Sequence, residues 1–311
     1  MYSLGQVKRG LALSAENPKY LLRELNRVYH SAPMDERFNA RGIDVFSKDW
    51  DTLVVLDGCR YDTFESHNTL PGELSSVRSR GAHTSEFLRG NFDGRTLYDT
   101  VYTTASPQLE RRKDNVDVDF HAVENIWNTD WWDEDAGTVR PAAMTEAAVE
   151  AHETYPEKRH VVHYMQPHYP FIGSHITDQT RKYNEQPDSG LDIWNQKMRG
   201  ELDASSEAIR EAYRRNLDLV LASVETLFSA IDGKVVVTAD HGNLFGERVS
   251  PLPVQEWGHP PRLYVPALVT VPWLTHTIDT RRAIESEAPE SVDEDVERET
   301  VEAQLESLGY L

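Results

Sequence analysis

An aspartate and a histidine stand side by side at Asp240 and His241, at the end of an apolar run and directly before Gly242. A carboxylate and an imidazole can bind one divalent metal ion when the following glycine lets the backbone turn. Asp57 ends a second apolar run and would supply a hard oxygen ligand opposite this pair. Taken singly, these are also ordinary turn signals. Together they predict a metal site that could activate a nucleophile.

Two further histidines lie in segments rich in proline. His168 is part of Gln-Pro-His-Tyr-Pro, and His259 is part of Trp-Gly-His-Pro-Pro. Proline restricts the backbone, so a histidine in such a loop is suited to a fixed role as a metal ligand or in substrate binding. Most of the 12 histidines are instead expected at the surface. We expect His168 and His259 to bind substrate or a second metal ion.

These residues need elements that bring them together. Three short apolar runs rich in Val, at 51–57, 160–165 and 234–239, predict buried strands. Between the last two, apolar residues recur with helical spacing over 201–231. The pattern predicts an α/β fold with a mostly parallel central sheet and helices on both faces. Ligands of such folds bind beyond the carboxyl ends of the strands, where the candidate residues stand.

The other segments complete one predicted domain, 1–311. Residues 1–45 form an N-terminal helical region, 107–140 an irregular insertion that could act as a lid, and 280–311 an acidic linker with a C-terminal helix. In the N-terminal region, apolar residues at helical intervals are expected to pack on the core: Leu11, Leu13, Leu21, Leu22, Leu25 and Val28.

Composition limits the partners and the location. The 52 acidic and 32 basic residues give a net charge of −20, which disfavours nucleic acid. Scattered acid with few lysines is typical of halophilic proteins. No run approaches the roughly 20 apolar residues of a membrane span, and the start lacks a secretory leader, so we expect a cytoplasmic protein. The single Cys59 rules out an internal disulfide or a multi-cysteine zinc cluster, and is expected to be a buried thiol.

Three motifs in a fixed order carry a family resemblance. They are Asp-Gly-Cys-Arg-Tyr-Asp at 57–62, Gln-Pro-His-Tyr-Pro-Phe at 166–171, and Thr-Ala-Asp-His-Gly-Asn-Leu-Phe-Gly-Glu at 238–247. The order resembles the alkaline phosphatase superfamily, with the closest likeness to its sulfatase-like and phosphoethanolamine transferase-like branches. The resemblance spans roughly 51–272, and the closing 305–310 also resembles the end of many sulfatase-like chains.

The resemblance implies a ligand set for the first metal ion. In that superfamily an early Asp, the nucleophile and a later Asp-His pair hold the ion, and these correspond to Asp57, a Ser or Thr, Asp240 and His241. Gly-Ala-His-Thr-Ser-Glu at 81–86 precedes an apolar pair and is typical of a helix start.

Either hydroxyl of this helix start could be the nucleophile, and we favour Thr84 over Ser85. The alternative is that both hydroxyls simply cap the helix. Arg60 could clamp an anionic oxygen, or instead pair with Asp62.

One departure from the sulfatases bears on the chemistry. No Cys-x-Pro-x-Arg pattern, the source of formylglycine, exists in the chain. Asn243 also differs from the Glu of many sulfatase relatives, without removing a metal ligand. We therefore favour a metal-dependent hydrolase or transferase that uses an unmodified Thr84 in a two-step displacement on a phosphate ester. Zinc or manganese suits the mixed ligands, and calcium is possible.

Two other hypotheses remain open: a sulfatase that works without formylglycine, and a non-catalytic member of the family that binds an anionic ligand. The expected substrate is a small-molecule, glycan-linked or lipid-linked ester. Specificity would reside in 107–140 and 173–202, and the oligomeric state is not predicted.

Overall fold

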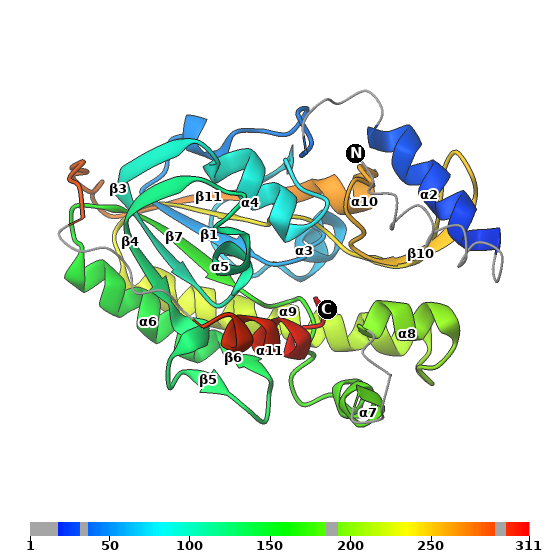
Figure 1. The fold of residues 1–311 in the computed structure, drawn as a ribbon. Helices are drawn as coiled ribbons and strands as arrows, with labels where there is room; N and C mark the ends of the chain where they lie inside the picture. Colours follow the sequence, from blue (N-terminus) through cyan, green and yellow to red (C-terminus); the bar gives the residue numbers. More distant parts are fainter. Residues whose placement is uncertain (1–17, 32–36, 185–191, 290–296, 311) are drawn as a thin grey trace.

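A seven-stranded sheet forms the centre of the molecule, in the strand order β2-β11-β8-β1-β7-β3-β4 (Figure 1). The computed structural model describes residues 18–31, 37–184, 192–289 and 297–310. The strands of this sheet are β1 (Thr52–Leu56), β2 (Glu73–Arg78), β3 (Arg95–Thr104), β4 (Val118–Asn125), β7 (Arg159–Tyr164), β8 (Gly233–Thr238) and β11 (Thr270–Ile278). Two small hairpins lie outside it: β5 (Trp132–Asp133) with β6 (Thr138–Val139), and β9 (Leu244–Val249) with β10 (Val254–Gly258).

The middle of the sheet is parallel. Strand β1 lies between β7 and β8 and pairs with both in parallel register, with Val54 opposite Val162 and Val237. Strands β3 and β4 continue the parallel arrangement, while β11 runs antiparallel to β8 and β2. The mostly parallel sheet predicted from the three apolar runs is therefore confirmed.

Helices cover both faces of this sheet (Figure 1). The helices of the described ranges are α2 (Pro18–Ser31), α3 (Tyr61–His67), α4 (Thr84–Phe92), α5 (Gln108–Arg112), α6 (Pro141–Thr154), α7 (His175–Asn184), α8 (Ile193–Arg199), α9 (Ser206–Ala230), α10 (Pro266–Val269) and α11 (Arg298–Ser307), with short 3-10 turns at Val45–Ser47 and Ile126–Asn128. Side chains alternate along β1: Val54 packs toward α6 and α9, and Val55 toward α4. The predicted helix at 201–231 corresponds to α9, whose first turn is capped by Ser205.

The segment 107–140 is more regular than predicted. It contains α5 and the edge strand β4, and Trp127 is fully buried in the core. Among the residues of β4 only Phe120 is buried, so the strand lacks the continuous apolar run by which the other strands are recognised. The expectation of an irregular insertion is wrong for this strand.

The N-terminal helix has an unexpected orientation. Four of the apolar residues expected to pack on the core, Leu21, Leu22, Leu25 and Val28, are exposed on α2. Leu11 and Leu13 lie outside the described residues. Within the described ranges, no helix has the length and apolar character needed to cross a membrane.

The predicted C-terminal helix corresponds to α11, and the chain after it ends beside the carboxyl ends of the central strands (Figure 1). The last described residue, Tyr310, makes hydrogen bonds there to Thr84 and Asp57. Residues 280–289 form no helix or strand, and 290–296 lie outside the described residues.

Candidate metal centre

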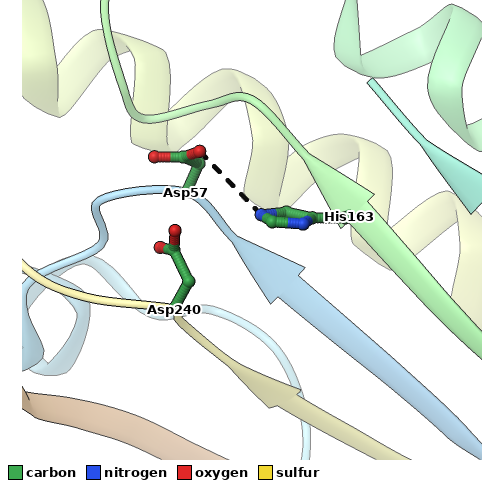
Figure 2. A group of neighbouring side chains, drawn as sticks. All are labelled: Asp57, His163 and Asp240. Carbon is green, nitrogen blue, oxygen red and sulfur yellow. Dashed lines mark ion pairs between the residues drawn. The ribbon is translucent and has the colours of Figure 1, made fainter. Parts of the chain in front are cut away.

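Asp57 follows the last residue of β1 and is fully buried. Its backbone N–H donates to the carbonyl of Tyr164 in β7, so the neighbouring strand still holds the main chain at this point. The next residue, Gly58, has φ +66°, the left-handed region that glycine adopts at little cost. The chain turns there, and the carboxylate of Asp240 points toward Asp57, whose own carboxylate lies near the ring of His163 (Figure 2).

Asp240 and His241 leave β8, the other neighbour of β1. Asp240 Oδ1 accepts the backbone N–H groups of Gly58 at 2.9 Å and His241 at 2.8 Å, which fixes the carboxylate. His241 donates its Nδ1–H to the carbonyl of Gly242 at 2.7 Å, so Nε2 is the ring nitrogen that faces the site. A Cβ atom at Gly242 would lie 2.1 Å from the carbonyl oxygen of Ala267, so this turn requires glycine.

Thr84 is the first residue of α4, and its hydroxyl faces the same point. Thr84 Oγ1 lies 3.3 Å from Asp57 Oδ2 and 3.2 Å from His241 Nε2. The cap of this helix is the ring of His83, whose Nδ1 accepts the N–H of Ser85 at 3.1 Å. The Ser85 hydroxyl also bonds to His83. Neither the hydroxyl of Thr84 nor that of Ser85 caps the helix. Of the two, only the hydroxyl of Thr84 contacts Asp57 and His241.

The distances among these side chains suit one metal ion. Four ligand atoms bound tetrahedrally at about 2.1 Å lie about 3.4 Å from one another. Here the separations are 3.2 Å for Thr84 to His241, 3.3 Å for His241 Nε2 to Asp240 Oδ2, and 3.7 Å for His241 Nε2 to Asp57 Oδ1. The four residues proposed from the sequence therefore converge at the carboxyl edge of the sheet.

The polar atoms of the site lack the partners that burial normally demands. Asp57 Oδ1 and Asp240 Oδ2 are buried and make no hydrogen bond. Burial and the charge of Asp240 raise the pKa of Asp57 well above its ordinary value. Two buried carboxylates that repel each other and keep unused lone pairs form a donor set that fits a divalent cation.

His163 was not singled out in the sequence. It lies in β7, and Asp57, His163 and Asp240 form a buried group whose ligand atoms all lie within 4.8 Å of one another (Figure 2). Its Nε2 is 3.9 Å from Asp57 Oδ2 and has no hydrogen bond. Burial lowers the pKa of His163 to about 4, which keeps the ring neutral and able to bind a metal ion.

Tyr310 closes the site from the C-terminal end of the chain. Its hydroxyl donates to Asp57 Oδ2 at 2.5 Å and lies 3.1 Å from Thr84 Oγ1. The ring stacks on that of His168, with centroids 4.8 Å apart. Burial, followed by the charges of Asp57 and Asp240, raises the pKa of Tyr310 far above its ordinary value, so the phenol remains a proton donor.

His168 and His259 meet beside this centre, with their Nε2 atoms 2.7 Å apart. Asn216 of α9 holds the loop of His168 by donating to its carbonyl at 3.0 Å. The Nδ1–H of His168 donates to the carbonyl of Tyr169. His259 stacks on His241 with centroids 4.5 Å apart, and its Nδ1 makes no hydrogen bond. Burial lowers the pKa of both rings, that of His168 to about 4, so both are neutral.

Arg60 takes part in ion pairs. Its guanidinium bonds to Asp62 at 2.5 Å and to Glu247 at 2.6 Å, and also to the carbonyl of Asn243 at 3.0 Å. The structure thus shows the ion pair with Asp62 that was the alternative to anion binding. Cys59 is buried and free, and burial raises the pKa of its thiol.

Three site residues escaped the sequence reasoning: His83, His163 and Tyr310. His83 directly precedes the candidate nucleophile, and His163 is a polar residue within the buried part of β7, so both left a local signal. Tyr310 lies in the closing segment 305–310 that resembles the end of many sulfatase-like chains, but no local pattern indicates its contact with Asp57, because 253 residues separate the two.

Comparison with known proteins finds similar folds at low sequence identity. The C-terminal periplasmic domain of EptC from Escherichia coli, in complex with zinc, has 13% identity and a TM-score of 0.46, over 75% of this chain and 74% of that one. The integral membrane protein lipooligosaccharide phosphoethanolamine transferase A from Neisseria meningitidis has 12% identity and a TM-score of 0.45, over 72% of this chain and 47% of that one. The corresponding domain of the phosphoethanolamine transferase EptC from Campylobacter jejuni has 12% identity and a TM-score of 0.42, over 73% of this chain and 78% of that one.

These neighbours agree with the resemblance expected from the motifs. No family model matches the sequence, and no curated protein matches it. At such identities the likeness concerns the fold, so the chemistry must be judged from the residues of the site.

The neighbours correct the cytoplasmic location expected from the sequence, because those from E. coli and C. jejuni are described as periplasmic domains. That expectation rested on the lack of an apolar leader and of an apolar span. Such an absence does not identify a compartment.

Proposed function

We propose that the chain is a metal-dependent enzyme that transfers a phospho group from a phosphate ester, with Thr84 as the nucleophile. The observation that carries the proposal is the convergence of the Thr84 hydroxyl with Asp57, Asp240 and His241, whose unused lone pairs face the same buried point. A nucleophilic hydroxyl needs activation at neutral pH, and a metal site beside it is one established means.

Asp57, Asp240 and His241 would hold the metal ion together with the hydroxyl oxygen of Thr84. Once bound, a divalent cation would lower the pKa of this hydroxyl and balance the two buried carboxylates. Zinc or manganese matches the oxygen and nitrogen donors. His163 is the alternative nitrogen ligand, because its free Nε2 also faces Asp57.

The reaction follows from the position of Thr84 at the start of α4. Its oxygen attacks phosphorus, a bond from Thr84 to phosphorus forms, and the bond to the leaving alcohol breaks. Water or an acceptor alcohol then attacks phosphorus and restores the hydroxyl. The positive end of the α4 helix dipole favours an anionic group there, although the N–H of Ser85 already donates to the ring of His83. His168 and His259 would contact the oxygens of the transferred group or bind a second ion.

The test is turnover of aryl phosphate monoesters, aryl phosphate diesters and an aryl sulfate by the purified protein in zinc or manganese. We expect turnover of a phosphate ester, its loss in Thr84→Ala, and its retention in the matched control Ser85→Ala, because the Ser85 hydroxyl faces His83. Preference for the sulfate ester would instead indicate a sulfatase without formylglycine. No turnover and no bound metal would refute the proposal.

Metal content distinguishes the two candidate nitrogen ligands. Elemental analysis of His241→Ala and His163→Ala should show loss of the metal in the first variant and retention in the second. The reason is distance: His241 Nε2 lies 3.3 Å from Asp240 and 3.2 Å from Thr84, whereas His163 Nε2 lies 3.9 Å from Asp57. The reverse result would assign the site to Asp57, His163 and Asp240.

A further inference from the structure

Glu86 is a buried carboxylate in the first turn of α4, two residues after Thr84. Outside the metal centre, the other buried carboxylates of the described residues belong to Asp51 and Glu256, and each pairs with an arginine. Glu86 forms no ion pair within the described part of the chain. Its oxygens instead accept three hydrogen bonds from uncharged donors. Burial of a carboxylate without a cation is costly, so these bonds are expected to hold something that the site requires.

One oxygen of Glu86 holds the turn that leads to the candidate nucleophile. Its Oε2 accepts the N–H of Ala82 at 3.0 Å, and Ala82 is fully buried two residues before Thr84. The residue between them, His83, has its ring beside that of His259, with centroids 5.0 Å apart. The turn before α4 therefore meets the loop of His259 at the candidate site.

The other oxygen of Glu86 holds that second loop. Its Oε1 accepts the N–H of Arg262 at 2.9 Å and the hydroxyl of Tyr264 at 3.2 Å. Arg262 has φ +66°, a conformation that residues other than glycine rarely adopt and that persists where surrounding bonds hold it. Only two prolines, 260 and 261, separate Arg262 from His259. Because proline fixes its own φ, a displacement of Arg262 would be passed on to His259.

We propose that Glu86 is a positioning residue, which sets His259 relative to the Thr84 hydroxyl by holding both loops with one carboxylate. The inference rests on the proposed phospho-group transfer, in which His259 would contact the oxygens of the transferred group. Glu86 acts through the two loops and not on the substrate itself. A misplacement of about 1 Å between reacting groups can lower a rate by about 100-fold, so such a clamp matters to turnover.

The kinetic test is Glu86→Gln with the aryl phosphate that the unchanged protein turns over. Glutamine has one acceptor oxygen in place of two, so one of the two loops loses its bond. We expect kcat to fall about tenfold to 100-fold, with KM changed by less than about twofold and the metal retained. Tyr264→Phe, which removes one bond to Oε1 and keeps that of Arg262, should lower kcat by a smaller factor and serves if Glu86→Gln does not fold. The matched control is Asp51→Asn, a buried carboxylate at the amino end of β1, which should keep its kcat.

A double variant shows whether Glu86 acts through His259. His259→Ala removes the ring that Glu86 is proposed to place, so in that background Glu86→Gln should change kcat by less than about twofold. Effects that multiply in the double variant would overturn the proposal. A rise in KM at unchanged kcat would do the same, because it would indicate a role in substrate binding. An equal fall of kcat in Asp51→Asn would indicate a general loss of structure instead.

A measurement without turnover separates this inference from the proposed function. If the unchanged protein turns over no ester, the phospho-group transfer is refuted, while the placement of His259 can still be measured by NMR. The ring-proton signals of His259, assigned by their loss in His259→Ala, depend on the stacked ring of His241, whose centroid lies 4.5 Å away. We expect these signals to shift in Glu86→Gln and to keep their positions in Asp51→Asn. Signals that stay in place in both variants would show that Glu86 does not position His259.

Discussion

Strand β1 has a buried aspartate at each end, and the two differ in whether their carboxylate oxygens have hydrogen-bond partners. Asp51, before the strand, is 1% exposed and accepts hydrogen bonds from Arg281 at 2.6 and 2.8 Å and from the backbone of Lys234 at 2.7 Å. Asp57, after the strand, is fully buried beside Asp240 and keeps one oxygen without a partner.

The pKa values of the two carboxyl groups follow this difference. Burial alone would raise the pKa of Asp51, but the hydrogen bonds and charge of Arg281 outweigh it, and the pKa is lowered. Burial raises the pKa of Asp57, and the charge of Asp240 raises it further. The amino end of β1 is a completed structural contact. The carboxyl end is arranged for a positive charge that the protein itself does not supply.

The largest expected effect lies at the carboxyl end. Asp240→Asn preserves an oxygen for the N–H groups of Gly58 and His241, while it removes the charge that would hold a cation. We expect loss of bound metal and a fall in kcat/KM of about 10³-fold, the order seen when a key electrostatic group is removed. Elemental analysis and steady-state kinetics measure both. The free energy of unfolding of the metal-free protein should not fall, because two repelling carboxylates are reduced to one.

The opposite pattern is expected at the amino end. Asp51→Asn places an amide where a carboxylate meets the guanidinium of Arg281. We expect the free energy of unfolding to fall by about 2 kcal/mol, a modest value for a buried group because Arg281 is partly exposed. Urea unfolding measures it. Metal content and turnover should be unchanged, and a loss of metal in Asp51→Asn would remove the distinction between the two ends.

Sequence reasoning located the core of the site for a definable reason. The strands at 51–57, 160–165 and 234–239 are buried on both faces, so each is a continuous apolar run with a visible end. Parallel neighbours end at the same edge of a sheet, which brings Asp57 and Asp240 together.

The remainder depends on contacts that leave no local pattern. Helical periodicity shows that α2 is amphipathic, but it does not show which side faces the protein. The orientation of α2 depends on the ion pair between Arg23 and Glu256, which are 233 residues apart in the sequence. Tyr310 reaches Asp57 across a still longer separation, and β4 is too exposed to form an apolar run.

A smaller effect at the carboxyl end concerns Tyr310, whose hydroxyl donates to the oxygen of Asp57 that also faces Thr84. Tyr310→Phe keeps the ring on His168 and removes only this bond. Groups that orient a metal ligand typically account for 10-fold to 100-fold in affinity, and we expect zinc binding weaker by about tenfold. Competition with a chelator measures it. Tyr155→Phe, which loses a hydroxyl contact to Glu124 away from the site, is the matched control. Equal affinities in all three proteins would exclude an orienting role.

The smallest effect is the pH dependence of the amino end. Because the pKa of Asp51 in the folded state lies below its ordinary value of 3.8, ionised Asp51 stabilises the fold above that pH. The contribution is lost as the pH falls below 3.8 toward the lowered pKa. The difference in unfolding free energy between the unchanged protein and Asp51→Asn, measured by urea unfolding of the metal-free proteins, should therefore be constant near neutral pH and shrink in acid.

Asp49 is bound by the same guanidinium, which lowers its pKa to about 2, but its side chain is 64% exposed. Asp49→Asn should therefore give a smaller difference throughout. A difference for Asp51→Asn that grows in acid would mean that the pKa of Asp51 in the folded state is raised, as that of Asp57 is, instead of lowered.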